Sequence, residues 1–297
     1  MPATRFICPD NQTTTIENCL EKCRLSQRCM FLPTLRAISK SLERNIKEPT
    51  VTELITGTRE TYLRKTTNYA VNPQDTLYAL HGNALHNINE NNTQGNILSE
   101  IRLKDDITSG KFDLYGQILD QEEGVLGDIK VTSSYKIMKA LGKYKIDVPT
   151  AEVYKTGLKK GQVKYIKQWQ DDGVRGILDW AIQLNYYRIL LEEAGLTVNK
   201  MIIQAMCRDS SLKTAKERGI DKPIYLIPIN KISDKWIKLY MNHKATALKV
   251  ALDNKRLPAI CKIKERWHNR KCLDYCNVSN SCPYGHMLKI KHNKEIS

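Results

Sequence analysis

Three charged residues in the middle of the chain have the types and spacing of a metal-dependent hydrolytic site. The stretches KFDLYGQILD (111–120) and GVLGDIKVT (124–132) have the pattern of β-strands, and QEEG between them favours a hairpin. Because side chains alternate along a strand, Asp128 and Lys130 share one face, which a hairpin would let Asp113 approach. Paired carboxylates bind hard cations such as Mg²⁺ or Mn²⁺, which activate water and neutralise charge on a phosphate, while a lysine positions that water. Taken alone, a D-x-K pattern also fits an ordinary solvated strand face.

Eight of the nine cysteines form two quartets with identical gaps of ten, three and five residues. The quartets are Cys8, Cys19, Cys23 and Cys29 near the start, and Cys261, Cys272, Cys276 and Cys282 near the end. The opening MPATRFICPDNQ lacks the apolar core of a secretory signal, so we expect a cytoplasmic protein whose clustered thiols bind metal rather than form disulfides. Four thiolates hold either Zn²⁺ or an iron–sulfur cluster. Cys207 lies on an expected strand outside both quartets and is expected to be a core residue.

The net charge of +15 predicts a polyanionic partner, and nucleic acid is the commonest one. The alternative is a basic surface that only keeps the protein soluble. No run of about 18 apolar residues occurs, so no membrane partner is expected. Tyr62, Tyr69 and Trp169 are of the type that stacks on bases, although aromatic side chains more often pack in a core.

These residues must be positioned by helices and strands, which the spacing of apolar residues along the chain predicts. The sequence predicts helices over 33–45, 76–91, 174–195 and 233–252, the third ended by Gly195 and the last capped by Ser233. It predicts strands over 97–103, 111–120, 124–132, 198–209 and 223–230. Residues 143–172 are polar and rich in lysine, and we expect a loop or insertion that meets DNA. The pattern predicts an α/β protein with a central mixed sheet flanked by helices.

Beyond these patterns, the chain resembles the PD-(D/E)XK nuclease superfamily, specifically its RecB-like exonuclease branch. The matching stretches are GNALHNINEN for the motif-I histidine, GKFD for the motif-II acid, Asp128-Ile-Lys130 for the (D/E)-x-K motif and QLNYY for the helical Q-x-x-x-Y. All lie in the family's order within residues 82–187. The resemblance implies that His86, Asp113, Asp128 and the Ile129 carbonyl are metal ligands.

The same resemblance implies roles for the remaining motif residues. Lys130 would hold or activate the attacking water, while Gln183 and Tyr187 would organise the site and contact the DNA strand. Tyr186 competes with Tyr187 for the last role, and Glu90 is a candidate to support the histidine. His81 matches no motif position and is expected to be structural. A histidine ligand favours Mn²⁺ at least as much as Mg²⁺.

The cysteines are similar to those of the cluster-bearing members of this branch, which include AddB and the CRISPR-adaptation nucleases. In those proteins one cysteine precedes the nuclease core and three close-set cysteines follow it, as CLDYCNVSNSC does here. The x3 gap and the resemblance favour a 4Fe-4S cluster for the second quartet, with Zn²⁺ as the alternative, and the first quartet stays open between the two. A complete quartet at each end departs from the family pattern. Either each quartet closes its own site, or ligands are shared between the ends.

These expectations define three regions and one leading function. Residues 1–32 form an N-terminal four-cysteine metal module, 33–255 a nuclease core, and 256–297 a C-terminal four-cysteine metal module with a basic tail that, like lysine-rich 155–167, attracts phosphate backbone. The expected function is a metal-dependent exonuclease on single-stranded DNA ends, in recombination, repair, or phage or mobile-element DNA processing. No G-x-x-x-x-G-K-[ST] occurs, so any unwinding requires a partner such as a helicase, and a single-strand-binding or annealing protein is a further candidate partner. The rivals are a non-catalytic nucleic-acid-binding adaptor or regulator with two four-cysteine metal modules, and a structure-specific endonuclease.

Overall fold

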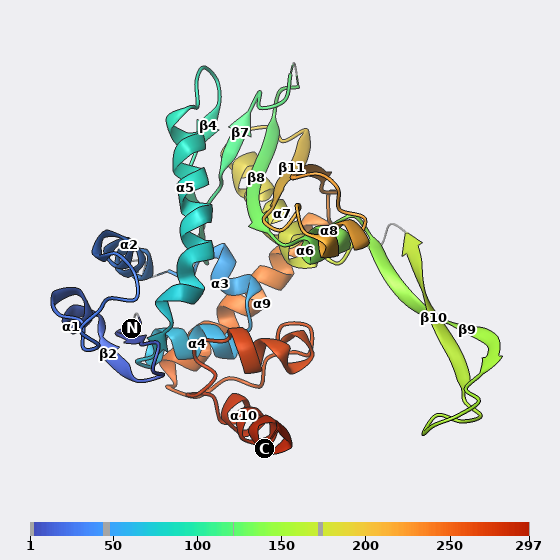
Figure 1. Ribbon diagram of the computed structural model, residues 1–297. Helices are drawn as coiled ribbons and strands as arrows, with labels where there is room; N and C mark the ends of the chain where they lie inside the picture. The colour runs from blue at the N-terminus through green and yellow to red at the C-terminus, as the bar shows by residue number, and fades with distance from the viewer. Residues whose placement is uncertain (1–2, 44–47, 121, 172–174, 297) are drawn as a thin grey trace.

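A five-stranded mixed β-sheet forms the centre of the computed structural model, which describes residues 3–43, 48–120, 122–171 and 175–296 (Figure 1). Its order is β12–β11–β8–β7–β4, and the bounds are β4 (Leu98–Ser99), β7 (Leu114–Gly116), β8 (Val125–Thr132), β11 (Lys200–Cys207) and β12 (Ile224–Pro228). β8 and β11 run parallel, and the other neighbours run antiparallel. β8 lies between two strands and its first five residues are buried, as expected of an apolar central strand. The chain is therefore a mixed α/β protein with a mixed sheet, as the sequence predicts.

Three long helices pack around this sheet. α5 (Leu77–Asn91) contacts β8, α7 (Leu178–Glu193) contacts β8 and β11, and α9 (Asp234–Asp253) contacts α7. Eleven residues of α7 are buried, which fits a helix that is apolar on nearly all sides. Gly195 adopts φ +85° just beyond α7, and its N–H donates to the Glu192 carbonyl at 3.1 Å, confirming the predicted helix end. α9 begins directly after Ser233 as predicted, although the Ser233 side chain makes no capping hydrogen bond.

The remaining helices and strands are mostly short and surround this centre. The helices are α1 (Ile16–Glu21), α2 (Leu32–Leu42), α3 (Val51–Ile55), α4 (Thr58–Thr66), α6 (Ser134–Ala140), α8 (Lys213–Glu217) and α10 (Pro283–Ile296), with the helical turns η1 (Pro73–Thr76), η2 (Trp267–Asn269) and η3 (Lys271–Tyr275). The strands are β1 (Arg5–Ile7), β2 (Thr13–Thr15), β3 (Ala70–Val71), β5 (Arg102–Lys104), β6 (Ser109–Lys111), β9 (Lys143–Val153) and β10 (Val163–Asp171). The predicted helix over 33–45 corresponds to α2, and residues 44 and 45 lie outside the described residues.

The N-terminal segment has a small apolar core of its own. β1 pairs with β2 and also with β3, so the first cysteine-bearing segment is joined to residues 70–71. Phe6 and Cys19 pack with Leu35 and Ile38 of α2 in a cluster separate from the main core, which lies between the central sheet and α7 and α9. The N-terminal cysteines therefore belong to a segment with a hydrophobic centre, not to a loose tail.

Three predicted elements are wrong in form, each for an identifiable reason. The strand expected over 97–103 is divided between β4 and β5, because Glu100 adopts φ +54° and turns the chain into a different sheet. The strand expected over 111–120 is reduced to β7, with Lys111 ending the separate strand β6. The loop expected over 143–172 is instead a long antiparallel hairpin of β9 and β10, whose described part ends at Asp171. The predicted antiparallel pairing of β7 with β8 is confirmed.

Candidate functional site

Two buried aspartates face each other across β7 and β8. Leu114 is paired with Gly127, so Asp113, directly before β7, stands opposite Asp128. Asp113 is 9% exposed and Asp128 is 2% exposed. The Ile129 N–H donates to Asp113 Oδ2 at 2.6 Å, which holds that carboxylate against the strand that carries Asp128. Asp113 and Asp128 thus lie opposite each other as expected, whereas the role predicted for the Ile129 carbonyl stays a prediction.

Helix α5 brings His86 to this carboxylate pair, together with a glutamate that sequence reasoning missed. His86 Nδ1 lies 3.0 Å from Glu100 Oε1 and 3.5 Å from Asp113 Oδ1. One donor atom from each of these three residues lies within 4.8 Å of the others, and no other group of three or more potential ligands this close occurs among the described residues. Lys111 forms an ion pair with Glu100. Imidazole and carboxylate donors together suit Mn²⁺ or Mg²⁺, so these side chains fit a divalent cation.

Glu100 reaches this position because of its unusual backbone conformation. Its φ of +54° lies in the left-handed region, and its side chain is only 6% exposed beside His86 and Lys111. A buried carboxylate held by two partners at a strained backbone position is typical of a functional site. The sequence gives little signal for this role, because Glu100 and Arg102 alternate with Ile101 and Leu103 as in an ordinary half-exposed strand.

Lys130 lies beside the two aspartates, on the same strand face as Asp128. Its Nζ is 2.9 Å from Asp128 Oδ1 and 2.7 Å from Oδ2. Burial alone would lower the pKa of Lys130, but the charges of Asp128 and Asp113 outweigh it, and the pKa is raised. Burial and the charge of Asp128 in turn raise the pKa of Asp113 well above its ordinary value. The group therefore holds an ammonium beside two carboxylates that repel each other, an arrangement that a divalent cation would relieve.

The predicted pair on α7, a helix that contacts β8, is joined by a hydrogen bond. Gln183 Nε2 donates to the Tyr187 hydroxyl at 3.2 Å, and both side chains are buried. Burial raises the pKa of Tyr187, and the charges of Asp128 and Asp113 raise it further, while the hydrogen bond from Gln183 lowers it. The ring packs against Gly110, where a Cβ would come within 2.4 Å of Tyr187 Cε1.

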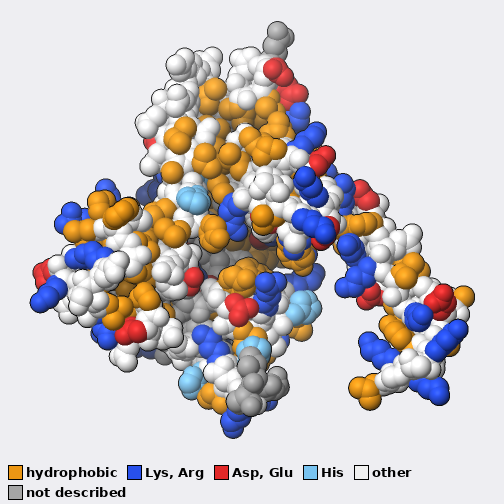
Figure 2. Space-filling view, viewed as in Figure 1, with side chains coloured by type: hydrophobic (Ala, Val, Ile, Leu, Met, Phe, Trp, Pro, Cys, Tyr) orange, Lys and Arg blue, Asp and Glu red, His pale blue; other side chains and the backbone are white. Residues whose placement is uncertain are grey.

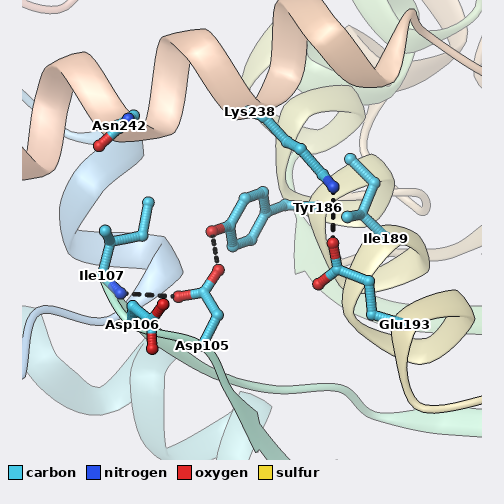
Figure 3. Close-up of a pocket in the computed structure, with 8 residues that line it drawn as sticks. All are labelled: Asp105, Asp106, Ile107, Tyr186, Ile189, Glu193, Lys238 and Asn242. Carbon is cyan, nitrogen blue, oxygen red and sulfur yellow. Dashed lines mark hydrogen bonds and ion pairs between the residues drawn. The ribbon is translucent and has the colours of Figure 1, made fainter.

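Tyr186, the competitor for this role, points elsewhere. Its hydroxyl donates to Asp105, in a hollow of about 290 Å³ that is also lined by Lys238 and Glu193 (Figure 3). Lys238 pairs with Glu193 at 2.6 Å, and Asp105 accepts hydrogen bonds from Tyr186 and from the Ile107 N–H. The charges of Asp128 and Asp113 act on Tyr187, whereas Tyr186 bonds to Asp105, so Tyr187 stays the candidate for the predicted role.

Two other residues weighed from the sequence lie away from the cluster. Glu90 is exposed on α5, and His81 is exposed with an edge-on contact to Tyr78. Cys207 is 8% exposed on β11, which confirms its expected place in the core.

The first cysteine quartet is not drawn together as tightly as the His86 group. Burial raises the pKa of Cys19, and the charges of Cys8, Cys29 and Cys23 raise it further, but among the described residues no three cysteine sulfurs lie within 4.8 Å of one another. Arg28 donates to the Cys19 carbonyl, which ties the segments together. All nine cysteines are described, and all are free thiols.

The second quartet is fixed to α4 and α9 by buried charges. Lys271 Nζ lies 2.6 Å from Glu60 Oε2, and Lys244 Nζ lies 2.7 Å from Glu265 Oε1. The Arg59 guanidinium lies 3.9 Å from Cys282 Sγ. Burial raises the pKa of Cys276 to about 11, and it also raises the pKa of Cys261 and Cys272. Because a thiol must lose its proton to bind a metal, these raised pKa values do not themselves indicate one, and a metal at either quartet stays a prediction.

Comparison with known proteins adds little to this geometry. No protein-family model matches the sequence, and no curated protein matches it. Two chains of solved structures match, and one is the crystal structure of SSO0001, with a TM-score of 0.43, 15% identity, and coverage of 85% of this chain and 94% of that chain. Within the described ranges, no helix combines the length and the apolar character needed to cross a membrane.

Proposed function

We propose that the protein is a metal-dependent DNA nuclease of the RecB-like PD-(D/E)XK type. The observation that supports this most is the convergence of His86, Glu100 and Asp113 on one point beside Asp128 and Lys130. Four of these five residues are the motif residues of the resemblance, in the expected order. They come from α5, the β4–β5 junction, the start of β7 and β8, so chain proximity alone does not bring them together.

The roles follow from the positions of the side chains. His86, Glu100, Asp113 and Asp128, with the Ile129 carbonyl, would hold Mg²⁺ or Mn²⁺. When bound, the cation supplies Lewis-acid chemistry at the phosphodiester and makes a water more acidic. Lys130 keeps its proton beside Asp128 and donates hydrogen bonds to a water or phosphate oxygen.

Tyr187 and Gln183 form the wall of the site from α7. The Gln183 amide fixes the Tyr187 hydroxyl, and that hydroxyl can donate to a phosphate oxygen of the bound strand. The net charge of +15 favours a nucleic acid substrate over a neutral one. Single-stranded DNA ends are the substrate that the family resemblance implies, in recombination, repair or phage DNA processing.

The two cysteine quartets would serve as structural metal sites within this proposal. Four thiols near each end would tie the termini to the core by holding Zn²⁺ or an iron–sulfur cluster. Each quartet has its own surroundings, Cys19 in the N-terminal apolar cluster and Cys282 beside Arg59, which favours two separate sites over one shared between the ends.

The deciding experiment compares end-labelled linear and circular single-stranded DNA, each with Mg²⁺ or Mn²⁺. We expect the wild-type protein to shorten the linear strand and to leave the circle intact, and we expect Lys130→Ala to lose about 10²–10⁴-fold in rate. Lys200→Ala is the matched control, because Lys200 lies on the neighbouring strand β11 but pairs with Glu122 at 2.7 Å. Cleavage of the circle would assign an endonuclease. If both wild type and control bind DNA, carry metal in the cysteine sites and never cut, the adaptor function replaces the nuclease.

A further inference from the structure

The hairpin of β9 and β10 stands clear of the rest of the molecule as an arm (Figure 1). It is inserted between the two elements that carry the candidate site. β8, with Asp128 and Lys130, leads through α6 into β9, and the chain after β10 continues to α7, with Gln183 and Tyr187. A two-stranded hairpin alone in water is at best marginally stable, so an arm of this length is expected to contact a partner.

The pairing register gives the arm two chemically different faces. Residues paired directly across an antiparallel ladder point to the same side. Lys145 pairs with Trp169, Asp147 with Lys167, and Pro149 with Tyr165, and these residues form one side, here called the lysine–aromatic face.

Between Tyr144 and Val148 the opposite side of the arm carries uncharged side chains. Ile146 pairs with Gln168, and Val148 pairs with Ile166. Between Lys143 and Pro149 the charges of the ladder therefore lie on the lysine–aromatic face, where Asp147 and Asp171 accompany the lysines. Nearer the tip, Lys164 and Glu152 form an ion pair at 2.8 Å.

The lysine–aromatic face presents flat rings and cations to solvent. Trp169 is 41% exposed and Tyr165 is 58% exposed. The Lys145 ammonium lies 4.6 Å from the centre of the Trp169 ring, and Lys167 lies between the two rings along β10. The rings are four residues apart, about 13 Å along the strand, and so are separate platforms rather than one stacked pair.

The charge of the arm selects among possible partners. Residues 143–171 contain seven lysines and three acidic residues, and three of these lysines, Lys155, Lys159 and Lys160, lie exposed at the tip between the strands. Blue Lys and Arg side chains gather near the end of the arm in Figure 2, beside hydrophobic and acidic ones. Exposed rings interleaved with cations are the combination that binds single strands, because bases stack on the rings while phosphates meet the cations.

We propose that the lysine–aromatic face of the arm is a binding surface for single-stranded DNA, with bases on Trp169 and Tyr165 and phosphates at Lys145 and Lys167. This inference rests on the proposed function and deepens it, since it assigns the surface that holds the strand while the His86 site cuts it. The arm would contribute affinity for the DNA strand, and hydrolysis would take place at the His86 site.

The test measures binding of a fluorescein-labelled oligothymidine by anisotropy over a series of salt concentrations, in the Lys130→Ala background so that the strand stays intact. For Lys145→Ala/Lys167→Ala we expect roughly tenfold weaker binding, and a log–log salt slope smaller by about 1.4, because two phosphate contacts are lost. For Trp169→Ala we expect roughly tenfold weaker binding, while Trp169→Phe, which keeps a stacking ring, stays near wild type.

Two matched controls separate the face from the fold and from bulk charge. Gln168→Ala/Gln170→Ala changes the opposite face of β10. Lys235→Ala/Lys249→Ala removes the same charge from exposed positions of α9. Both controls should bind as the parent protein does.

The outcomes distinguish failure of the arm from failure of the nuclease. Unchanged affinity and slope in the lysine and tryptophan variants, or equal losses in the controls, would overturn the arm surface even if wild type cuts DNA. A selective loss in those variants would support it, even if no protein with Lys130 intact cuts. If Ile146→Ser/Ile166→Ser dissociates an oligomer while the lysine variants bind DNA normally, the arm is a protein contact and the inference is wrong.

Discussion

Replacing Gly110 by alanine should damage the candidate site through packing alone. Gly110 lies on β6 and is buried. An alanine Cβ there would lie 2.4 Å from Tyr187 Cε1 and 2.9 Å from Val51 Cγ2, where ordinary carbon contacts are about 3.5–4.0 Å. Tyr187 is 3% exposed and Val51 is fully buried, so neither neighbour has open space to enter. Something must shift by about 1 Å.

The magnitude follows from this overlap. Overpacking of a buried site costs about 1–3 kcal/mol, and for a chain of this length about 2 kcal/mol corresponds to a fall of about 3 °C in Tm. The Tyr187 ring would move. This would weaken the hydrogen bond from Gln183 and displace a hydroxyl on which the charges of Asp113 and Asp128 act. A displacement of about 1 Å in a catalytic group can cost about 10²-fold in rate. We therefore expect Gly110→Ala to lose both stability and activity.

Gly82→Ala is the matched control with the opposite sign. A Cβ at Gly82 meets nothing within 4 Å, and Gly82 lies inside helix α5. Alanine should therefore stabilise the protein by about 0.5–1 kcal/mol. Thermal and urea unfolding of both variants, with nuclease assays at a temperature where each is folded, measures the two effects.

A double-mutant cycle identifies the partner of Gly110. In a Tyr187→Leu background the Cε1 atom is absent, so Gly110→Ala should cost at least about 1 kcal/mol less than in wild type. If Gly110→Ala is as stable and active as wild type, or if its cost is the same with leucine at 187, the packing argument for the position of Tyr187 is refuted.

Three further predictions follow from the same structure. Glu100→Gln should raise the Mn²⁺ concentration needed for half-maximal cleavage by at least about tenfold, whereas Glu90→Gln, exposed on α5, should not change it; equal behaviour would remove Glu100 from the metal site. Asp209 accepts hydrogen bonds from the Ser134 amide at 2.6 Å and hydroxyl at 2.7 Å; partial burial would raise the pKa of Asp209, but these bonds outweigh it and the pKa is lowered. Asp209→Asn should thus reduce the free energy of unfolding by about 1–3 kcal/mol at neutral pH, and the difference should disappear as the pH falls through the lowered pKa; a difference that persists in acid would contradict this linkage. Cys23→Ala should lower the metal content of the purified protein, measured by elemental analysis, while Cys207→Ala, in the core, should leave it unchanged; no change in either variant would rule out a metal at the first quartet.

The parts of the fold that sequence predicts well are those with a strong local period. α7 is recognisable from its long apolar pattern and the glycine that ends it, and β8 from a run of apolar residues between turn signals. The alternation rule also placed Asp128 and Lys130 on one face, and their contact at 2.7 Å confirms it. The hairpin prediction then brought Asp113 opposite them, because pairing of β7 with β8 follows from a short connection.

The parts that sequence does not predict depend on contacts between distant segments. Residues 143–171 have a polar composition that favours a loop, yet they pair over almost their full length, because cross-strand contacts such as Lys145 with Trp169 are absent from any local pattern. The exact fit of Gly110 against Tyr187 joins residues far apart in the chain, so no spacing rule could indicate it.

Glu100 brings a third carboxylate to the candidate site, and this changes the balance of charge there. Glu100, Asp113 and Asp128 supply three carboxylates, while Lys111 and Lys130 supply two ammonium groups within ion-pair range. Without a further cation one negative charge is uncompensated, and the raised pKa of Asp113, caused by burial and by Asp128, is the physical consequence. A site built only for stability would pair these charges or replace them with apolar groups, which costs less. The excess carboxylate, with the His86 imidazole beside it, therefore supports the proposed cation site.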